Sequence, residues 1–253
     1  MPPELYSATD ARSTHFERGS AQLAFAGTHA NSRSADQHIH FPEAAAAQVR
    51  VGDWRKRMLD VSMAALALAL LLPLMLLIAA LIKFFSPGPV LYGHERVGRD
   101  GRPFKCLKFR TMVVDGDKVL RDHLASCEEA RREWETTRKL KNDPRVTPLG
   151  HILRKSSADE LPQLINIVRG EMSIVGPRPV VRDELRYYGE NAAFYLASRP
   201  GLTGLWQVSG RNLTSYEARV AYDRAYCESW SLWTDLVLIA RTVPIVISRQ
   251  GTY

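Results

Sequence analysis

The feature that most constrains the fold of this chain is an apolar stretch at residues 61–82, which contains no charged side chain. At 22 residues it is long enough to form a helix that crosses a bilayer. Pro73 lies in the middle, where a proline removes one backbone hydrogen bond and kinks a helix. The fold must therefore accommodate a long apolar helix with a defect at its centre.

Basic residues lie on both sides of this stretch and bear on its orientation. Lysine and arginine favour the cytosolic side of a membrane, so two basic flanks place both ends on one face. Each half is about a dozen residues, or roughly 18 Å of helix, against a hydrocarbon core of ~30 Å. We therefore expect a re-entrant hairpin over residues 51–85 with its break at Pro73, while a proline-kinked spanning helix stays open as the alternative. The basic residues are Arg55, Lys56, Arg57, Lys83, Arg96, Arg99 and Arg102.

Residues 1–50 show neither helical nor strand periodicity and are rich in small and polar residues, which predicts a mostly disordered tail. His38 and His40, near Asp36, are candidate metal ligands, but ligands in a floppy tail must first be ordered, which favours the inert interpretation. The first 30 residues contain no apolar core of a signal peptide, so we expect none at this end.

The composition limits the class of partner. The 253 residues carry a formal net charge of +7, which indicates anionic partners: nucleic acid, acidic lipid head groups or phosphorylated small molecules. Charge alone does not choose among them. Cys106, Cys127 and Cys227 are odd in number and widely spaced, so they form neither a disulfide framework nor a zinc pattern and indicate a reducing, cytosolic setting.

A basic strand is predicted within residues 103–112. In an extended segment, Lys108 and Arg110 fall on one face and Leu107 and Phe109 on the other. Two cations beside a membrane segment are candidates for phosphate binding. Taken alone, a solvated strand face is the simpler interpretation.

Most of the remaining chain has helical patterns. Opposite charges at helical spacing predict an exposed helix at 115–145, and further helices are expected at 183–197 and 215–233. The apolar segment 236–247 is interrupted by an arginine and a proline, which favours an interfacial or core helix. The loop at 199–211 contains three glycines and has backbone N–H groups that can face an anion.

Two adjacent carboxylates, Asp159 and Glu160, form the most informative polar motif. Locally they match a capping box with Ser157 as the N-cap of a new helix, and capping is the simpler interpretation. Capping, however, requires none of the cations around the pair, which are Arg154, Lys155 and Arg178. Mg²⁺ binds one or two carboxylates together with phosphate oxygens. An aspartate can also act as a nucleophile that forms an acyl phosphate. The pair is therefore a candidate metal and catalytic site for phosphoryl transfer.

Several long motifs, in the right order, resemble those of the bacterial sugar transferase family, the monotopic phosphoglycosyl transferases. The similarity runs over about 200 residues, from Lys56 to the C-terminus. It implies a mixed α/β, mainly helical fold, in which the membrane hairpin precedes a small cytosolic catalytic domain at residues 86–253 with amphipathic interfacial helices. Pro73 matches the helix-breaking proline of the family. The motifs are KFRTM at 108–112, KSSADELPQ at 155–163, GPRP at 176–179 and RPGLTGLWQ at 199–207.

The resemblance also implies a reaction. A UDP-sugar and undecaprenyl phosphate give undecaprenyl-diphosphate-sugar and UMP, with Mg²⁺ as the cofactor, as the first step of exopolysaccharide synthesis. By family analogy Asp159 attacks the sugar-linked phosphorus, Glu160 completes the dyad as metal ligand or partner of the nucleophile, and the lipid phosphate then attacks the adduct. The positions that match phosphate-contacting residues of the family are Lys108, Arg154 and Arg178.

Two residues depart from the family pattern. Leu72 replaces the serine often found before the breaking proline, and Ala158 replaces the leucine often found before the carboxylates. The first puts a serine-assisted break in doubt, while the second leaves the chemistry in place.

The implied setting is a bacterial inner membrane with the catalytic domain facing the cytoplasm. The expected partners are a UDP-sugar, undecaprenyl phosphate and membrane lipids, with no nucleic acid, and a homo-oligomer stays open. Galactose 1-phosphate is the expected group and glucose 1-phosphate the near alternative. Two other functions stay open: direct transfer, with Asp159 and Glu160 only holding Mg²⁺, and a non-enzymatic, membrane-anchored basic scaffold.

Overall fold

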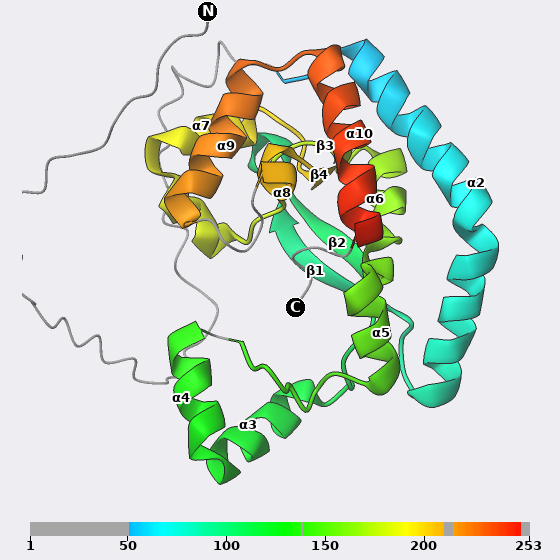
Figure 1. Cartoon of the computed structure of the whole chain (residues 1–253), viewed down its shortest axis with the longest axis vertical. Coiled ribbons are helices and arrows are strands. Elements are labelled where there is room, and N and C mark those ends of the chain that lie inside the picture. The colour runs from blue at the N-terminus through cyan, green and yellow to red at the C-terminus, as the bar shows by residue number, and fades with distance from the viewer. Residues whose placement is uncertain (1–50, 138, 210–214, 249–253) are drawn as a thin grey trace, which may run out of the picture. The chain divides into compact units, whose positions relative to one another are not determined.

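The computed structural model describes residues 51–137, 139–209 and 215–248 (Figure 1). The tail predicted at residues 1–50 lies outside them, as does the end of the loop predicted at 199–211. Helices dominate the described residues, and two small sheets complete them. The prediction of a mixed but mainly helical fold is therefore confirmed.

The apolar stretch forms most of one long helix, α2 (Trp54–Phe85). Asp53 caps its N-terminus, because the Asp53 carboxylate accepts hydrogen bonds from the backbone N–H groups of Arg55 and Lys56. One side of α2 packs against the rest of the chain, and its members recur every three or four residues, as expected for one face of a helix. They are Asp60, Ala64, Leu68, Leu71, Met75, Ile78 and Ile82.

The helix continues through Pro73, so the break predicted there is corrected. A proline lacks one N–H and crowds the preceding turn, but the helix can bend and keep its other hydrogen bonds. In Figure 1 α2 is bowed along its length. It is the one helix among the described residues that is long and apolar enough to cross a membrane. The division into two helices is therefore wrong, whereas the re-entrant orientation stays a prediction.

Two short sheets lie between the helices. Strands β1 (Leu91–Val97) and β2 (Pro103–Phe109) form an antiparallel hairpin in which Tyr92 faces Lys108. The strand predicted within 103–112 is thus present but ends before Arg110. Strands β3 (Ser173–Val175) and β4 (Gly201–Thr203) are parallel.

Two glycines, Gly176 and Gly201, allow the backbones beside β3 and β4 to approach each other closely. A Cβ on Gly201 would lie 2.1 Å from the backbone nitrogen of Gly176, so no larger residue fits there. The N–H of Gly201 donates to the carbonyl of Pro177, and the N–H of Gly176 donates to the carbonyl of Thr203. The Gly201 amide is therefore not available for the anion-binding role considered for this loop.

The helices differ in part from those predicted. The exposed helix expected at 115–145 is two helices that meet at Cys127, and the one expected at 183–197 is a 3-10 segment followed by a short α-helix. The helix expected at 236–247 lies within α10. In chain order these elements are η1 (Arg99–Gly101), α3 (Gly116–Ser126), α4 (Glu128–Thr137), α5 (Pro148–Ser156), η2 (Ala158–Glu160), α6 (Gln163–Arg169), η3 (Arg182–Asn191), α7 (Ala192–Leu196), α8 (Leu205–Ser209), α9 (Tyr216–Glu228) and α10 (Leu232–Ser248).

Two apolar clusters hold α2 against the other elements. The first joins the N-terminal half of α2 to β2 and α6, and the second joins its C-terminal half to the end of β2 and to α5. Full burial of each large side chain contributes about 1.5–3 kcal/mol. Their members include Ala64, Phe104, Leu164 and Ile167 in the first, and Met75, Ile78, Ile82, Phe109 and Leu153 in the second. Contact therefore extends over both halves of the helix.

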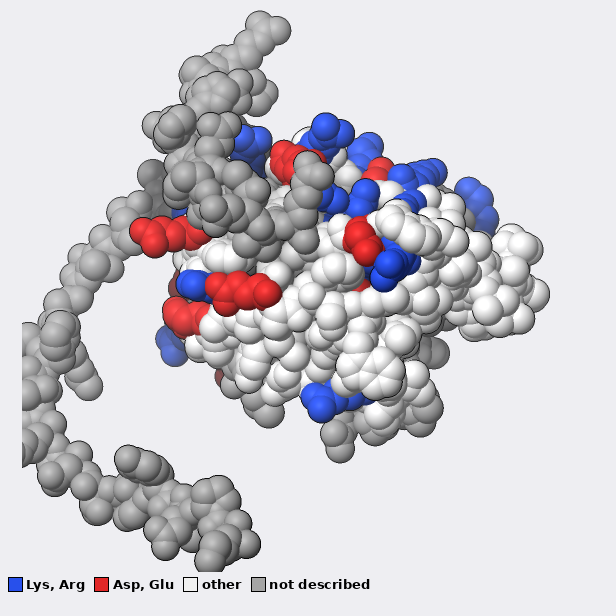
Figure 2. All heavy atoms as spheres, turned by 90° about the horizontal axis from the view of Figure 1, so that it is seen from above, with Lys and Arg blue, Asp and Glu red and all other residues white. Residues whose placement is uncertain are grey.

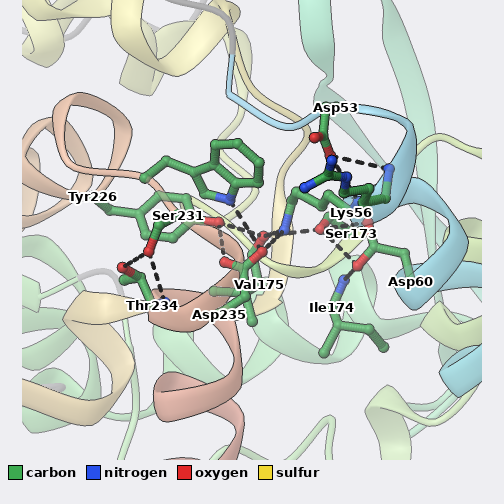
Figure 3. A network of polar contacts seen from close by, with 12 residues as sticks. Asp53, Lys56, Asp60, Ser173, Ile174, Val175, Tyr226, Ser231, Thr234 and Asp235 are labelled. Atoms are coloured by element: carbon green, nitrogen blue, oxygen red, sulfur yellow. Dashed lines mark hydrogen bonds and ion pairs between the residues drawn. The ribbon is translucent and has the colours of Figure 1, made fainter.

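A buried polar network anchors the first turns of α2 (Figure 3). Lys56 forms an ion pair with Asp235 of α10, with Nζ 2.7 Å from Oδ2, and donates to the carbonyl of Val175 in β3. Asp60 accepts a hydrogen bond from the backbone N–H of Ile174. These contacts fix the start of α2 to β3 and α10.

Arg57 is also used inside the fold. Its guanidinium donates to the carbonyls of Ile167 and Val168 at the end of α6. Lys56 and Arg57 are two of the three cations that directly precede the apolar stretch, and both are bound to acceptors within the protein. Arg55 is the member of that flank which is left exposed, so the charge argument for the re-entrant hairpin is weaker than expected.

The outer side of α2 is an exposed apolar surface. Helix α2 lies at the right of Figure 1, and the same side of the space-filling view in Figure 2 is mostly free of charged residues. Part of α10 is exposed and apolar as well. Contiguous apolar surface of this kind marks contact with a membrane or another protein. The large exposed apolar residues are Trp54, Met58, Leu66, Leu70, Leu72, Leu74, Leu76, Leu77, Phe84 and Phe85 of α2, and Trp233, Leu236 and Val243 of α10.

Candidate active site

Asp159 and Glu160 lie in the 3-10 turn η2, between α5 and α6. The residue before this turn, Ser157, ends α5 in a left-handed conformation with φ of 56°. Ser157 makes no side-chain capping hydrogen bond, and α6 begins only after Pro162. The predicted capping box is therefore wrong. The carboxylates follow the C-terminal end of α5, and their placement comes from the sharp turn at Ser157.

Lys108 reaches the two carboxylates from β2. Its Nζ atom lies 2.6 Å from Glu160 Oε1 and 4.0 Å from Asp159 Oδ2. The strand is held in place by Asn166 of α6, which accepts from the Leu107 N–H and donates to the Lys105 carbonyl. The structure thus brings Lys108 to the adjacent carboxylates Asp159 and Glu160, although Lys108 is 52 positions from Glu160 in the sequence.

The carboxyl group of Asp159 is nearly buried, with 8% of the residue exposed. Burial raises its pKa above the usual aspartate value, and the neighbouring charge of Glu160 raises it further. Lys108 and Arg154 act in the opposite direction and lower this pKa. The two cations therefore offset part of the cost of keeping Asp159 ionised in a poorly solvated position.

The other predicted cations are placed differently from one another. Arg154, in the last turn of α5, donates through Nε to Thr111 Oγ1 at 2.9 Å and lies close enough to lower the pKa of Asp159. Arg110 donates instead to the backbone carbonyls of Ser86 and Pro87, just after α2. Its guanidinium is tied to that turn, so the structure does not bring it to the carboxylates.

A large cleft of about 1580 Å³ has the carboxylate pair on its wall. Pockets for drug-sized ligands have volumes of roughly 300–1,000 Å³, so this cleft is larger than a pocket for one such molecule. Ala67, Leu71 and Leu74 of α2 also line it, which gives it an apolar side next to the exposed helix. Its basic residues include Arg96, Lys108, Arg110, Arg145, Arg154, Arg178 and Arg219. The cleft thus suits a ligand with both phosphate and hydrocarbon parts.

Three cleft residues were missed as site candidates from the sequence. His94 and Arg96 lie on β1, where Arg96 Nη2 is 2.9 Å from His94 Nδ1. Burial and the charges of Arg96 and Lys108 lower the pKa of His94. Arg219 lies on α9, within the helix predicted at 215–233, where no motif indicated a site. The pairing of β1 with β2 was the available signal for His94, which faces Cys106 two positions before Lys108.

The carboxylate pair can supply part of the coordination shell of a divalent cation. Among the described residues there is no group of three or more histidine, cysteine, aspartate or glutamate side chains that could hold a metal. A complete protein cage is therefore absent from this part of the chain. Mg²⁺ needs only one or two carboxylates when phosphate oxygens and water complete its octahedron. Asp159 and Glu160 can supply that number.

A protein-family model described as bacterial sugar transferase matches residues 51–249. The match includes every described element and the whole of the cleft. The chain belongs to the bacterial sugar transferase family. The resemblance seen in the motifs is confirmed, and this sugar transferase is an enzyme, a phosphoglycosyl transferase.

Three curated relatives illustrate the similarity. The exopolysaccharide production protein ExoY of Rhizobium meliloti (strain 1021) is 55% identical over 88% of this chain and 98% of its own length. The undecaprenyl-phosphate galactose phosphotransferase of Salmonella typhimurium is 47% identical over 78% of this chain and 41% of its own. The UDP-glucose:undecaprenyl-phosphate glucose-1-phosphate transferase of Caulobacter vibrioides is 44% identical over 79% of this chain and 73% of its own.

Proposed function

We propose that this sugar transferase moves galactose 1-phosphate from UDP-galactose to undecaprenyl phosphate and releases UMP, as the first step of exopolysaccharide synthesis. One observation carries the proposal: a nearly buried aspartate beside two cations lies in a cleft that is also lined by the apolar helix α2. The cations of this cleft suit the phosphates of a nucleotide-sugar and of a lipid phosphate, and its apolar wall suits the hydrocarbon chain of the lipid. The names of the relatives support the choice of these substrates.

In the first step, an oxygen of Asp159 attacks the sugar-linked phosphorus of UDP-galactose. A new O–P bond forms, the bond to the bridging oxygen breaks, and UMP leaves with that oxygen and the electron pair. Lys108 and Arg154 neutralise charge around the phosphoryl group, since phosphoryl transfer depends on positioning and on electrostatic stabilisation. The ion pair between Lys108 and Glu160 holds the ammonium beside Asp159.

In the second step, an oxygen of undecaprenyl phosphate attacks the same phosphorus. The bond to Asp159 breaks, the carboxylate is restored, and the undecaprenyl-diphosphate-sugar is released. No net proton transfer is needed in either step, because a phosphate or a carboxylate leaves as an anion. Mg²⁺, held by Asp159 and Glu160 with the substrate phosphates, would supply charge neutralisation at the transferred group.

The packing of α2 supports a membrane orientation in which both of its ends face the cytoplasm of a bacterium at the inner membrane. Buried residues of α2 contact the charged domain from its first to its last turns. If the helix crossed the bilayer upright with these contacts intact, it would take β2, α5 and α6 into the hydrocarbon core. Charged side chains there are costly. A shallow, same-side insertion avoids this cost.

Asp159→Asn and Glu160→Gln test the assignment of the nucleophile. We expect Asp159→Asn to abolish UMP release from UDP-galactose and undecaprenyl phosphate, and Glu160→Gln to retain measurable release, because only Asp159 forms the bond. Full turnover in Asp159→Asn would contradict the proposal. Direct transfer is separated by initial-rate patterns, since the covalent route gives ping-pong kinetics. A non-enzymatic scaffold would release no UMP with any sugar donor.

Glucose 1-phosphate is the second candidate group, because the relative from Caulobacter vibrioides carries a glucose-specific name. Galactose and glucose differ in the orientation of one hydroxyl group. UMP release over a panel of UDP-sugars decides between them. We expect the highest kcat/KM with UDP-galactose, and a preference for UDP-glucose would replace that substrate without changing the chemistry.

A further inference from the structure

Arg219 is a buried cation on the wall of the cleft that no step above uses. It lies on α9, and 8% of its surface is exposed to solvent. Its Nε and Nη2 atoms have no hydrogen-bond partner among the described residues. Buried polar groups in proteins are nearly always paired, so unpaired guanidinium nitrogens at a cleft call for a ligand that supplies acceptors.

The packing around Arg219 fixes the guanidinium without neutralising it. Its Cζ atom lies 5.2 Å from the centre of the Trp206 ring and 5.0 Å from that of Tyr216. Arg178 lies over the same indole, with its Cζ atom 5.4 Å from the ring centre. Two guanidinium groups thus share one aromatic support, which attracts each of them through its π-face.

The nearby carboxylates are engaged elsewhere. Asp223 accepts a hydrogen bond from the Tyr188 hydroxyl at 2.7 Å, and burial raises its pKa to about 6. Glu184 lies 3.9 Å from Arg96 and accepts from the Val181 N–H. Neither carboxylate comes within ion-pair distance of Arg178 or Arg219 among the described residues. The two guanidinium groups therefore keep donors for an added anion.

We propose that Arg219 and Arg178 form a second phosphate subsite of the cleft, distinct from the group around Asp159. The planar donor fork of arginine matches the oxygens of a phosphate better than a lysine does. The inference rests on the proposed function, in which two phosphoryl groups occupy the cleft during each step. The subsite holds the one that is not attacked: the phosphate of UMP as it leaves, or the phosphate of the lipid before it attacks.

Direct binding measurements on the full chain in detergent test this subsite without relying on turnover. The probes are UMP for the nucleotide source and undecaprenyl phosphate in mixed micelles for the lipid source. We expect Arg219→Gln to weaken binding of one probe at least tenfold and to leave the other within twofold. The weakened probe identifies the phosphate that the subsite holds. Arg219→Lys should recover part of the loss, because it restores the charge but not the fork.

Arg224→Gln is the matched control, since Arg224 lies on the same helix and is paired with Glu228 at the surface. We expect it to bind both probes as the unaltered chain does. The thermal midpoint of each variant identifies loss of fold. Unchanged binding of both probes by Arg219→Gln, in a chain that itself binds them and releases UMP, would overturn the subsite alone. Failure of the unaltered chain to release UMP would instead overturn the proposed function.

Discussion

At the scale of single residues, the site depends on the environment of Asp159. A nucleophilic carboxylate must be ionised, yet burial raises the pKa of Asp159. Lys108 and Arg154 lower that pKa, whereas Glu160 raises it. In the proposed mechanism these three neighbours set the pH at which Asp159 becomes available as the nucleophile, and each contribution has a definite sign.

The acid limb of the kcat/KM profile for UMP release should lie above the usual aspartate pKa of about 4, because the proposed nucleophile Asp159 must be ionised to attack and its pKa is raised. Lys108→Met removes a charge that lowers the pKa, so the limb should move to higher pH. Glu160→Gln removes a charge that raises the pKa, so the limb should move to lower pH. Shifts of both limbs in the same direction would contradict this electrostatic assignment, whatever the loss of rate.

Asp159, Glu160 and Lys108 could be chosen as site candidates from the sequence because their motifs are local and specific, and the structure places them together. Arg219 could not, because its burial against Trp206 and Tyr216 depends on how α8 and α9 pack. Arg110 shows the converse: strand alternation placed it beside Lys108, but β2 ends at Phe109 and Arg110 turns to the carbonyls of residues 86 and 87.

At the scale of elements, helix termini were predicted less well than helices. Ser157 and Glu160 matched a capping box, yet Ser157 is left-handed and ends α5. Pro162 carried the better signal, because proline is common where a helix begins and α6 starts immediately after it. The break predicted at Pro73 is wrong. Residues of α2 before and after Pro73 pack against the domain, and the helix is continuous between them.

The anchor at the start of α2 gives a prediction at this scale. Lys56→Met leaves Asp235 buried and charged without its cation, and breaking a buried pair in this way costs about 3–5 kcal/mol. We expect a loss of about 3 kcal/mol, at the lower end of this range, because Tyr226 and Trp230 still donate to Asp235. Chemical unfolding in detergent measures it. Arg55→Gln, at an exposed neighbouring position, should change stability by less than about 0.5 kcal/mol; equal effects of the two changes would refute the anchor.

At the scale of the whole molecule, α2 is both a part of the domain and its apolar exterior. Its inner side builds the clusters that position β2 and α5, and its outer side carries exposed leucines. The sequence predicted the apolar segment but not its packing, because the inner and outer sides of α2 are almost equally hydrophobic. The inner side is distinguished mainly by Asp60 and Ala64.

The proposed same-side orientation predicts the accessibility of both ends of α2. Arg55→Cys and Phe85→Cys place a thiol at each end, and both positions are exposed. In intact cells, an impermeant maleimide should label neither thiol, and it should label both in inside-out vesicles. Labelling of one end from outside the cell would show a spanning helix and refute the orientation.

The central claim is that Asp159 carries the sugar phosphate between donor and lipid. The most direct measurement is the mass of the peptide that contains Asp159, after rapid quenching of the enzyme with UDP-galactose and Mg²⁺ but without undecaprenyl phosphate. We predict the added mass of one hexose phosphate on Asp159, together with one equivalent of UMP, and its disappearance when the lipid is added. An unmodified Asp159 in an enzyme that releases UMP only after lipid is added would contradict the claim.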